Sequence, residues 1–204
     1  MLGGDCSLLI GAGIANARAW RAGLVHVDGH TDFRHPGGAE AVASVAGEDL
    51  AAAIGLHTAA VADVDGVGPY FDHRRTVHLG CREEDEDREE VAAAIADLIP
   101  APEVRDQGVD AAVARVRAAT GGHPYWLQLD VDVLDPSVLP AVDSPDPGGL
   151  TAEELVALLQ ALAPSAIGAS VTVFDPDLDP DGRYAALLTD VLVEGLSALG
   201  ALVE

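Results

Sequence analysis

The stretch Val25–Asp32, with the sequence VHVDGHTD, decides how we interpret the whole chain. An apolar segment that begins at Gly23 predicts a strand, and this strand runs into the pattern Asp-x-His-x-Asp at Asp28, His30 and Asp32. Because alternate side chains of an extended chain point to the same side, we expect these three to converge on one point. Two carboxylates and an imidazole suit a divalent metal of borderline to hard character. The stretch therefore predicts a metal site at the end of a strand.

A second segment, much later in the chain, has the same form. Leu127–Asp132 (LQLDVD) predicts an apolar strand that ends in two acids, Asp130 and Asp132. Two strands that each present carboxylates at their C-terminal ends are typical of an open parallel sheet, where ligands bind beyond those ends. Asx-turns at the strand exits, or N-caps of following helices, would explain either motif alone. The occurrence of both motifs favours a metal site.

The rest of the chain alternates between strand and helix patterns. Strands are expected at 23–28, 76–80, 125–130 and 167–174, and helices at 8–21, 39–54, 83–98, 109–119, 151–162 and 183–202. This alternation predicts an α/β fold with a mainly parallel sheet. The length predicts one domain over residues 1–204, and with only 4% aromatic residues its core must consist of Ala, Val, Leu and Ile.

The composition excludes several classes of partner. The formal net charge is −23 and the sequence contains no Lys, so the molecule should repel phosphate backbones and anionic membranes. No apolar run reaches the length of a membrane span, and the N-terminus has no signal-peptide pattern. The two cysteines, Cys6 and Cys81, are too few for a disulfide framework and suit a reducing cytoplasm. We therefore expect a cytoplasmic protein that binds neither nucleic acid nor membrane.

Four blocks of sequence resemble the ureohydrolase family, which includes arginase, agmatinase, guanidinobutyrase and formiminoglutamase. They are Gly3–Ser7 (GGDCS), Asp28–Asp32 (DGHTD), Asp130–Pro136 (DVDVLDP) and Gly148–Thr151 (GGLT), in the family's order and spacing. The resemblance covers nearly the whole chain. It implies a three-layer α/β/α sandwich, arginase-like, with a two-manganese site beyond the strand ends and assembly into trimers or hexamers. Family members carry a longer segment before the first block, so the resemblance implies an N-terminally short version of this fold.

The resemblance also implies a role for each ligand. Asp28 and Asp130 would each bridge the two metals. Asp32 would complete the shell of the first metal, and His30 and Asp132 would complete that of the second. Asp32 could also orient the attacking hydroxide, so the catalytic residues implied are Asp32, Asp28 and His30.

Cys6 stands where the family usually has a His that ligates the first metal. A thiolate can bind a metal, but it is a softer donor that favours zinc or iron over manganese. The alternative is that Cys6 is a small packed residue without a ligand role. Cys6 therefore leaves the identity of the first metal open.

Two further positions differ from the family pattern. A proton-shuttling His of the arginase and agmatinase pattern corresponds to Ala46, and the nearest substitutes are His35 and His57. A Glu that pairs with the substrate's guanidinium corresponds to Val173 or Thr172. Because an apolar residue cannot pair with a buried cation, arginine and agmatine are doubtful substrates, and the substrate-binding residues stay unknown.

These observations predict a metal-dependent hydrolase that cleaves a non-peptide C–N bond of a small cationic guanidino or amidine substrate. The first alternative is a catalytically weak or inactive member of the family that serves as a metal-binding or assembly subunit. The second is a deacetylase-like enzyme with a single zinc. Deacetylases place a pair of adjacent His residues beside that zinc, and this sequence has no such pair.

Overall fold

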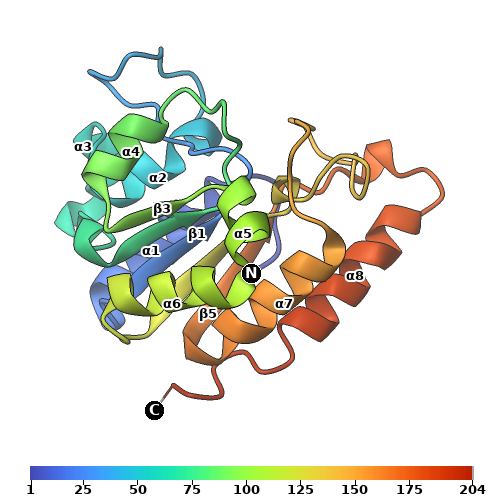
Figure 1. Ribbon diagram of the computed structural model, residues 1–204. Coiled ribbons are helices and arrows are strands. Elements are labelled where there is room, and N and C mark those ends of the chain that lie inside the picture. Colours follow the sequence, from blue (N-terminus) through green and yellow to red (C-terminus); the bar gives the residue numbers. More distant parts are fainter. Residues whose placement is uncertain (204) are drawn as a thin grey trace.

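A computed structural model describes residues 1–203, and within these residues the strands form one parallel sheet (Figure 1). The strands are β1 (Gly23–Val27), β2 (Thr76–Leu79), β3 (Asp97–Ile99), β4 (Tyr125–Asp130) and β5 (Ala166–Thr172). Their order across the sheet is β3-β2-β1-β4-β5. The strand that leads into the first motif, β1, therefore lies at the centre and pairs with β4, the strand that leads into the second.

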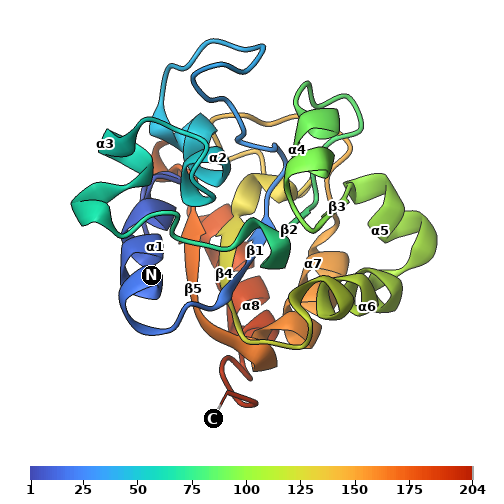
Figure 2. The same cartoon turned by 90° about the vertical axis from the view of Figure 1, so that its left-hand side faces the viewer.

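Helices cover both faces of the sheet (Figure 2). One layer contains α1 (Leu8–Ala19), α2 (Asp49–Ala53), α3 (Ala59–Ala62) and α4 (Arg88–Ala94), and the other contains α5 (Ala101–Gln107), α6 (Val109–Thr120), α7 (Ala152–Leu162) and α8 (Arg183–Gly195). The expected three-layer α/β/α sandwich is confirmed. None of the helices within residues 1–203 is both long and apolar enough to span a membrane.

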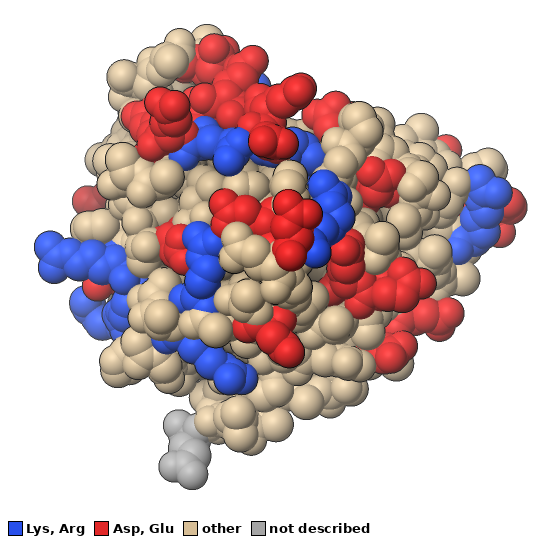
Figure 3. Space-filling view, viewed as in Figure 1, with Lys and Arg blue, Asp and Glu red and all other residues tan. Residues whose placement is uncertain are grey.

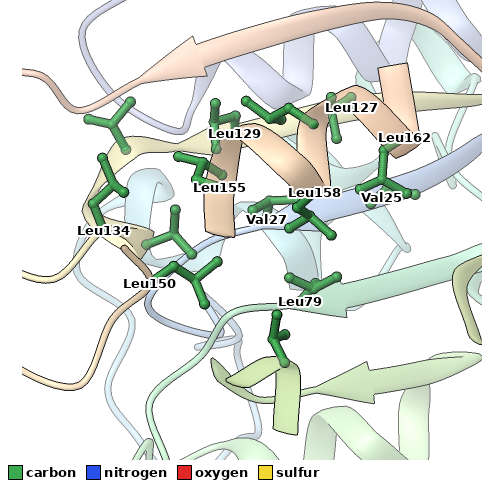
Figure 4. Packing of buried hydrophobic residues seen from close by; sticks show 14 of the residues in the cluster. Val25, Val27, Leu79, Leu127, Leu129, Leu134, Leu150, Leu155, Leu158 and Leu162 are labelled. Atoms are coloured by element: carbon green, nitrogen blue, oxygen red, sulfur yellow. The ribbon is translucent and has the colours of Figure 1, made fainter. Parts of the chain in front are cut away.

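The core on the α5–α8 side consists of branched aliphatic side chains. Val25 and Val27 of β1 and Leu127 and Leu129 of β4 point toward Leu158 and its neighbours on α7 (Figure 4). Every residue of β1 is buried, as expected for a central parallel strand covered on both faces. Burial of a Leu or Val contributes about 1.5–3 kcal/mol, so this packing fixes the positions of the strand ends.

Local signals explain where two elements begin. Helix α7 starts with a capping box. The Thr151 hydroxyl accepts a hydrogen bond from the Glu154 amide, and the Glu154 carboxylate accepts one from the Thr151 amide. At the N-terminus, Leu2 forms a parallel bridge with Val171 of β5, and the Gly3 amide donates to the Val171 carbonyl at 3.1 Å. This pairing brings the residues that follow, including Cys6, to the end of β5.

Two of the expected helices are much shorter than the sequence pattern suggested. Of the segment 39–54, only the 3₁₀ turn Val45–Glu48 and α2 are helical. Of the segment 83–98, only α4 is an α-helix, and Asp97–Ile99 forms the edge strand β3. In the second case the segment starts with five consecutive acids, Glu83–Asp87. The Asp85 carboxylate accepts hydrogen bonds from the amides of Thr31 and Asp87, so this acidic run is held in a loop by contacts that the local sequence pattern does not reveal. Helix α5 was not expected at all.

Candidate metal centre

The two acidic motifs meet at one edge of the sheet because β1 and β4 are neighbours in register. Val27 pairs with Leu129, so Asp28 and Asp130 leave the sheet side by side. Strand β1 ends at Val27, and the segment beyond it turns instead of continuing as an extended chain. The convergence expected from strand alternation is therefore produced by turns, and Asp32 adopts a left-handed φ of 47°, which Asp tolerates better than most residues.

Both motifs use the same local device. Oδ1 of Asp28 accepts the His30 amide at 2.7 Å, and Oδ1 of Asp130 accepts the Asp132 amide at 2.8 Å. These are the Asx-turns that the sequence had offered as an alternative to a metal site. Each turn occupies one carboxylate oxygen and leaves the other, Oδ2, directed at the neighbouring donors. The turns therefore position the carboxylates and do not compete with metal binding.

Cys6 lies beside the free oxygens of these two carboxylates. Its Sγ is 2.8 Å from Oδ2 of Asp130, 4.0 Å from Oδ2 of Asp28 and 3.0 Å from the hydroxyl of Thr172. Burial, followed by the charge of Asp130, raises the pKa of the Cys6 thiol. Donor atoms of Cys6, Asp28 and Asp130 lie within 4.8 Å of one another. A thiolate among buried carboxylates requires a compensating positive charge.

His30 lies on the other side of Asp28. Its Nδ1 is 3.0 Å from Oδ2 of Asp132, and its Nε2 is 3.0 Å from Oδ2 of Asp146. The hydrogen bond with Asp132 raises the pKa of His30 to about 9. Donor atoms of Asp28, His30 and Asp132 again lie within 4.8 Å of one another. The Gly29 amide donates to Oδ1 of Asp132, and a Cβ at Gly29 would lie only 2.8 Å from that oxygen.

The charge of this cluster favours cations. Burial and the neighbouring carboxylates raise the pKa of Asp28, and the same two causes raise the pKa of Asp32 and of Asp130. Two groups of potential ligands share Asp28. One contains the sulfur of Cys6 and the other a nitrogen of His30, and the remaining donors are carboxylate oxygens. Oxygen, nitrogen and sulfur donors around shared carboxylates fit a pair of divalent cations. Five of the six expected ligands form these two groups, whereas Asp32 belongs to a third group with His26 and Asp49.

A cavity of about 510 Å³ opens onto the cluster, and its wall includes Cys6, His30, Asp32, Asp130 and Asp132. Its rim is rich in acids from two loops: Glu84, Asp85, Glu86, Asp87, Asp143 and Asp146. Acidic side chains gather over the loops at the top of the molecule (Figure 3). A cavity with this charge attracts cationic ligands.

The positions that differ from the family pattern also lie at this cavity. Val173 and Ala46 are among its lining residues. Thr172 is buried and interacts with Cys6 and with Gln128, so of the two residues considered for the missing Glu it is Val173 that faces the cavity. Of the proposed substitutes for the shuttle His, His35 lies 3.0 Å from Glu90 and His57 lies 2.9 Å from Glu48. Neither belongs to the lining residues in the described part of the chain.

Sequence reasoning missed Arg82, which connects the two loops of the site. Its Nη2 donates to the carbonyls of Asp132 and Asp146, and its Nε also donates to that of Asp146. Arg82 follows β2, the strand next to β1, so its place just beyond a neighbouring strand end was the available signal. The third group, formed by His26, Asp32 and Asp49, was also missed.

Comparison with known protein families places the chain. The model of the arginase family matches residues 1–197, which is nearly the full length. The chain belongs to the arginase family. Arginase from Bacillus cereus has the same fold, with a TM-score of 0.85 and 26% identity over 97% of this chain and 69% of the other. Formimidoylglutamase from Bacillus subtilis, at 22% identity and a TM-score of 0.76 over 97% of this chain and 59% of the other, shares the fold.

Relatives in sequence include an agmatinase and a guanidinobutyrase. Agmatinase of Chromobacterium violaceum is 31% identical over 53% of this chain and 33% of its own length. Guanidinobutyrase of Pseudomonas aeruginosa is 28% identical over 90% of this chain and 54% of its own length. The chain thus spans about half, or less, of these relatives.

Proposed function

We propose that the chain is a binuclear metal hydrolase that cleaves a non-peptide C–N bond of a guanidino or amidine substrate. The observation that carries the proposal is the sharing of Asp28 between two donor groups, Cys6–Asp28–Asp130 and Asp28–His30–Asp132. A shared carboxylate between two adjacent ligand sets is what a pair of metals requires. Membership of the arginase family supports the same chemistry.

We propose two manganese ions as the cofactor, with zinc or iron as alternatives on the Cys6 side because sulfur is the softer donor. Asp28 and Asp130 would bridge the ions, Cys6 and Asp32 would complete the first site, and His30 and Asp132 the second. When bound, such a pair of cations lowers the pKa of a shared water so that hydroxide is available near neutral pH.

The protein groups around this centre would position the reactants. Asp28 and Asp130 are each fixed by an Asx-turn, so the free oxygens keep their spacing. Asp32 lines the cavity and would accept a hydrogen bond from the attacking water, thereby orienting it toward the substrate carbon. The acids of the rim would draw a cationic substrate to the cavity. The leaving amine would depart as the tetrahedral intermediate collapses.

One specific observation favours a second candidate function, a metal-binding or assembly subunit with little or no catalysis. Val173 and Ala46 line the cavity. The resemblance assigns Ala46 to the position of the shuttle His, and Val173 or Thr172 to that of the guanidinium-pairing Glu. An unpaired cation in a cavity is costly, and proton transfer without a positioned base is slow. A substrate of this chain must therefore be held by groups other than these two.

A substrate panel tests the proposal directly. The protein is loaded with Mn²⁺ and incubated with guanidino compounds of different chain length and with formimino compounds, and release of urea, formamide, ammonia and amine is measured. We expect metal-dependent release from at least one compound and none from Asp130→Ala. If the protein binds two ions per chain and releases nothing from any compound, the second candidate function is correct.

Location and assembly belong to the same proposal. We propose a cytoplasmic protein, supported by two free, buried cysteines in a fold without a disulfide among the described residues. We also propose a homo-oligomer, supported by exposed apolar side chains such as Trp20, which is 59% exposed. Light scattering coupled to gel filtration would measure the assembly, and a monomer would contradict it.

A further inference from the structure

A third group of donors lies behind the two that form the proposed binuclear centre. It consists of His26, Asp32 and Asp49, whose donor atoms lie within 4.8 Å of one another. His26 lies near the C-terminal end of β1, and Asp49 begins α2 in the helical layer that covers one face of the sheet. Both side chains are completely buried. The group therefore connects the central strand with the helical layer that covers it.

Three polar atoms of this group, all on His26 and Asp49, have no hydrogen-bond partners. Both carboxylate oxygens of Asp49 and Nε2 of His26 are buried and unpartnered in the structure. Oδ1 of Asp49 lies 3.3 Å from Nε2 of His26, but the two groups do not have the orientation of a hydrogen bond. A buried carboxylate without partners is strongly unfavourable. Either the neighbouring His26 or a bound cation would compensate this charge.

The distance between the two atoms fits a shared cation. Two ligands bound to one metal at about 2.0–2.1 Å in tetrahedral geometry lie about 3.3–3.4 Å apart. Such ligands point at the ion and not at each other, which agrees with the poor alignment of His26 and Asp49. A hydrogen-bonded ion pair at the same distance would instead align the N–H with the carboxylate oxygen.

A second histidine orients the first. Nδ1 of His26 lies 3.0 Å from Nδ1 of His78, its partner in the β1–β2 register. When Nδ1 of His26 carries the proton and donates it to His78, the lone pair on Nε2 faces Asp49. A metal-binding imidazole commonly has its other nitrogen fixed in this way.

We propose that His26, Asp32 and Asp49 bind a third divalent cation, of the type of zinc, that stabilises the contact between β1 and α2. One nitrogen and two carboxylates are a suitable donor set for zinc. Asp32 has two carboxylate oxygens, so it can contribute to this site and to the first metal of the proposed centre. The third site does not depend on hydrolysis, and it would exist in an inactive protein as well.

Metal counting tests the proposal. Wild type, Asp49→Asn and Asp130→Asn are loaded with Zn²⁺ alone, freed of excess ion and analysed for zinc per chain. We expect about three ions in the wild type and a loss of one in Asp49→Asn. Asp130→Asn is the matched control, because Asp130 belongs to the binuclear centre only. It should lose the ions of that centre and keep the one held by His26 and Asp49.

The outcomes separate this site from the proposed function. One ion in the wild type that disappears in Asp49→Asn would support the third site and contradict the binuclear centre. Equal zinc content in wild type and Asp49→Asn would overturn the third site and leave His26 and Asp49 as an ion pair. If Asp49→Asn does not fold, anomalous diffraction of zinc-loaded wild-type crystals decides, because the proposal requires a peak between His26 and Asp49 and fails without it.

Discussion

The two halves of the proposed metal centre are built differently. The His30 half, consisting of His30, Asp132 and Asp146, is held on both sides, since each nitrogen of the imidazole lies 3.0 Å from a carboxylate oxygen. The Cys6 half, consisting of Cys6, Thr172 and Val173, rests on the N-terminal segment and on the end of β5, where the Val173 amide donates to the Gly4 carbonyl. Val173 there has a φ of 79°, which is unusual for a β-branched residue.

This difference separates metal binding from substrate binding. The His30 half carries the ligands that the resemblance of the sequence motifs implies, and the imidazole also interacts with an outer carboxylate, that of Asp146. The Cys6 half carries the departures, with a thiol as donor and an apolar side chain at the cavity wall. Under the proposed function, the metal ligands are thus retained while the cavity wall that would face a guanidinium differs from the family pattern.

The largest effect is expected from removal of a carboxylate that we propose both halves share. Asp130→Ala should lose both ions of the centre and all hydrolysis, because Asp130 is proposed to bridge them. Asp143→Ala is the matched control, since Asp143 lies on the rim of the same cavity and outside the donor groups. Elemental analysis and product release are the measurements. Two ions per chain in Asp130→Ala would show that the halves do not share this ligand.

A smaller effect is expected from the outer carboxylate of the His30 half. Asp146→Asn should weaken metal binding at the second site about 10–100-fold, the usual result of losing such a partner of a ligating histidine. Asp143→Asn, three residues earlier in the same loop, should bind metal as the wild type does. Titration with Mn²⁺ measures both. Equal affinities in the two variants would show that Asp146 interacts with His30 without orienting it.

Substitutions of Val173 test whether the Cys6 half determines which substrate is recognised. Wild type should turn over free arginine at less than about 10 per second, the median for enzymes. Val173→Glu should raise kcat/KM for arginine about tenfold, equivalent to about 1.4 kcal/mol, because a carboxylate would pair with the guanidinium. Val173→Gln has nearly the same shape without the charge and relieves the same backbone constraint, so it should not produce the gain. An equal rise of kcat/KM in both variants would show that the shape of the side chain, and not its charge, limits activity on arginine.

The sequence predicted the parts of the site that depend on local pattern. Asp28 and Asp130 follow apolar strands, and parallel strands place their ends together, so their proximity was predictable. The role of Asp49 was not, because its contact with His26 joins a helix start to a strand distant in the sequence. The acidic run near Asp85 looked helical for the same reason, since its loop is stabilised by the distant Thr31. The local sequence pattern predicts helices and strands, whereas the contacts between them are known only from the packed structure.

The smallest effect is expected from the donor atom of the Cys6 half. If the Cys6 thiolate ligates the first metal, that site should hold manganese less firmly than the second, because sulfur is a softer donor than nitrogen. Cys6→His should then raise manganese content by up to one ion per chain. Cys6→Ser is the control, since it keeps the size of the side chain and removes the sulfur. Manganese content is measured after dialysis against a fixed concentration of the ion.

Alkylation of the thiol distinguishes a ligand from a packed residue. Burial and the charge of Asp130 raise the pKa of Cys6, so without metal the group is a neutral thiol that reacts slowly, and only the thiolate is nucleophilic. A bound cation would favour the thiolate but would occupy its lone pair, so metal should slow alkylation further in the folded protein. Cys81, whose pKa is raised to about 12 by burial, serves as the internal reference because it lies outside the donor groups of the described residues. If metal leaves the rate at Cys6 unchanged relative to Cys81, and Cys6→His does not alter manganese content, Cys6 is a packed residue and the Cys6 half binds its metal through carboxylates alone.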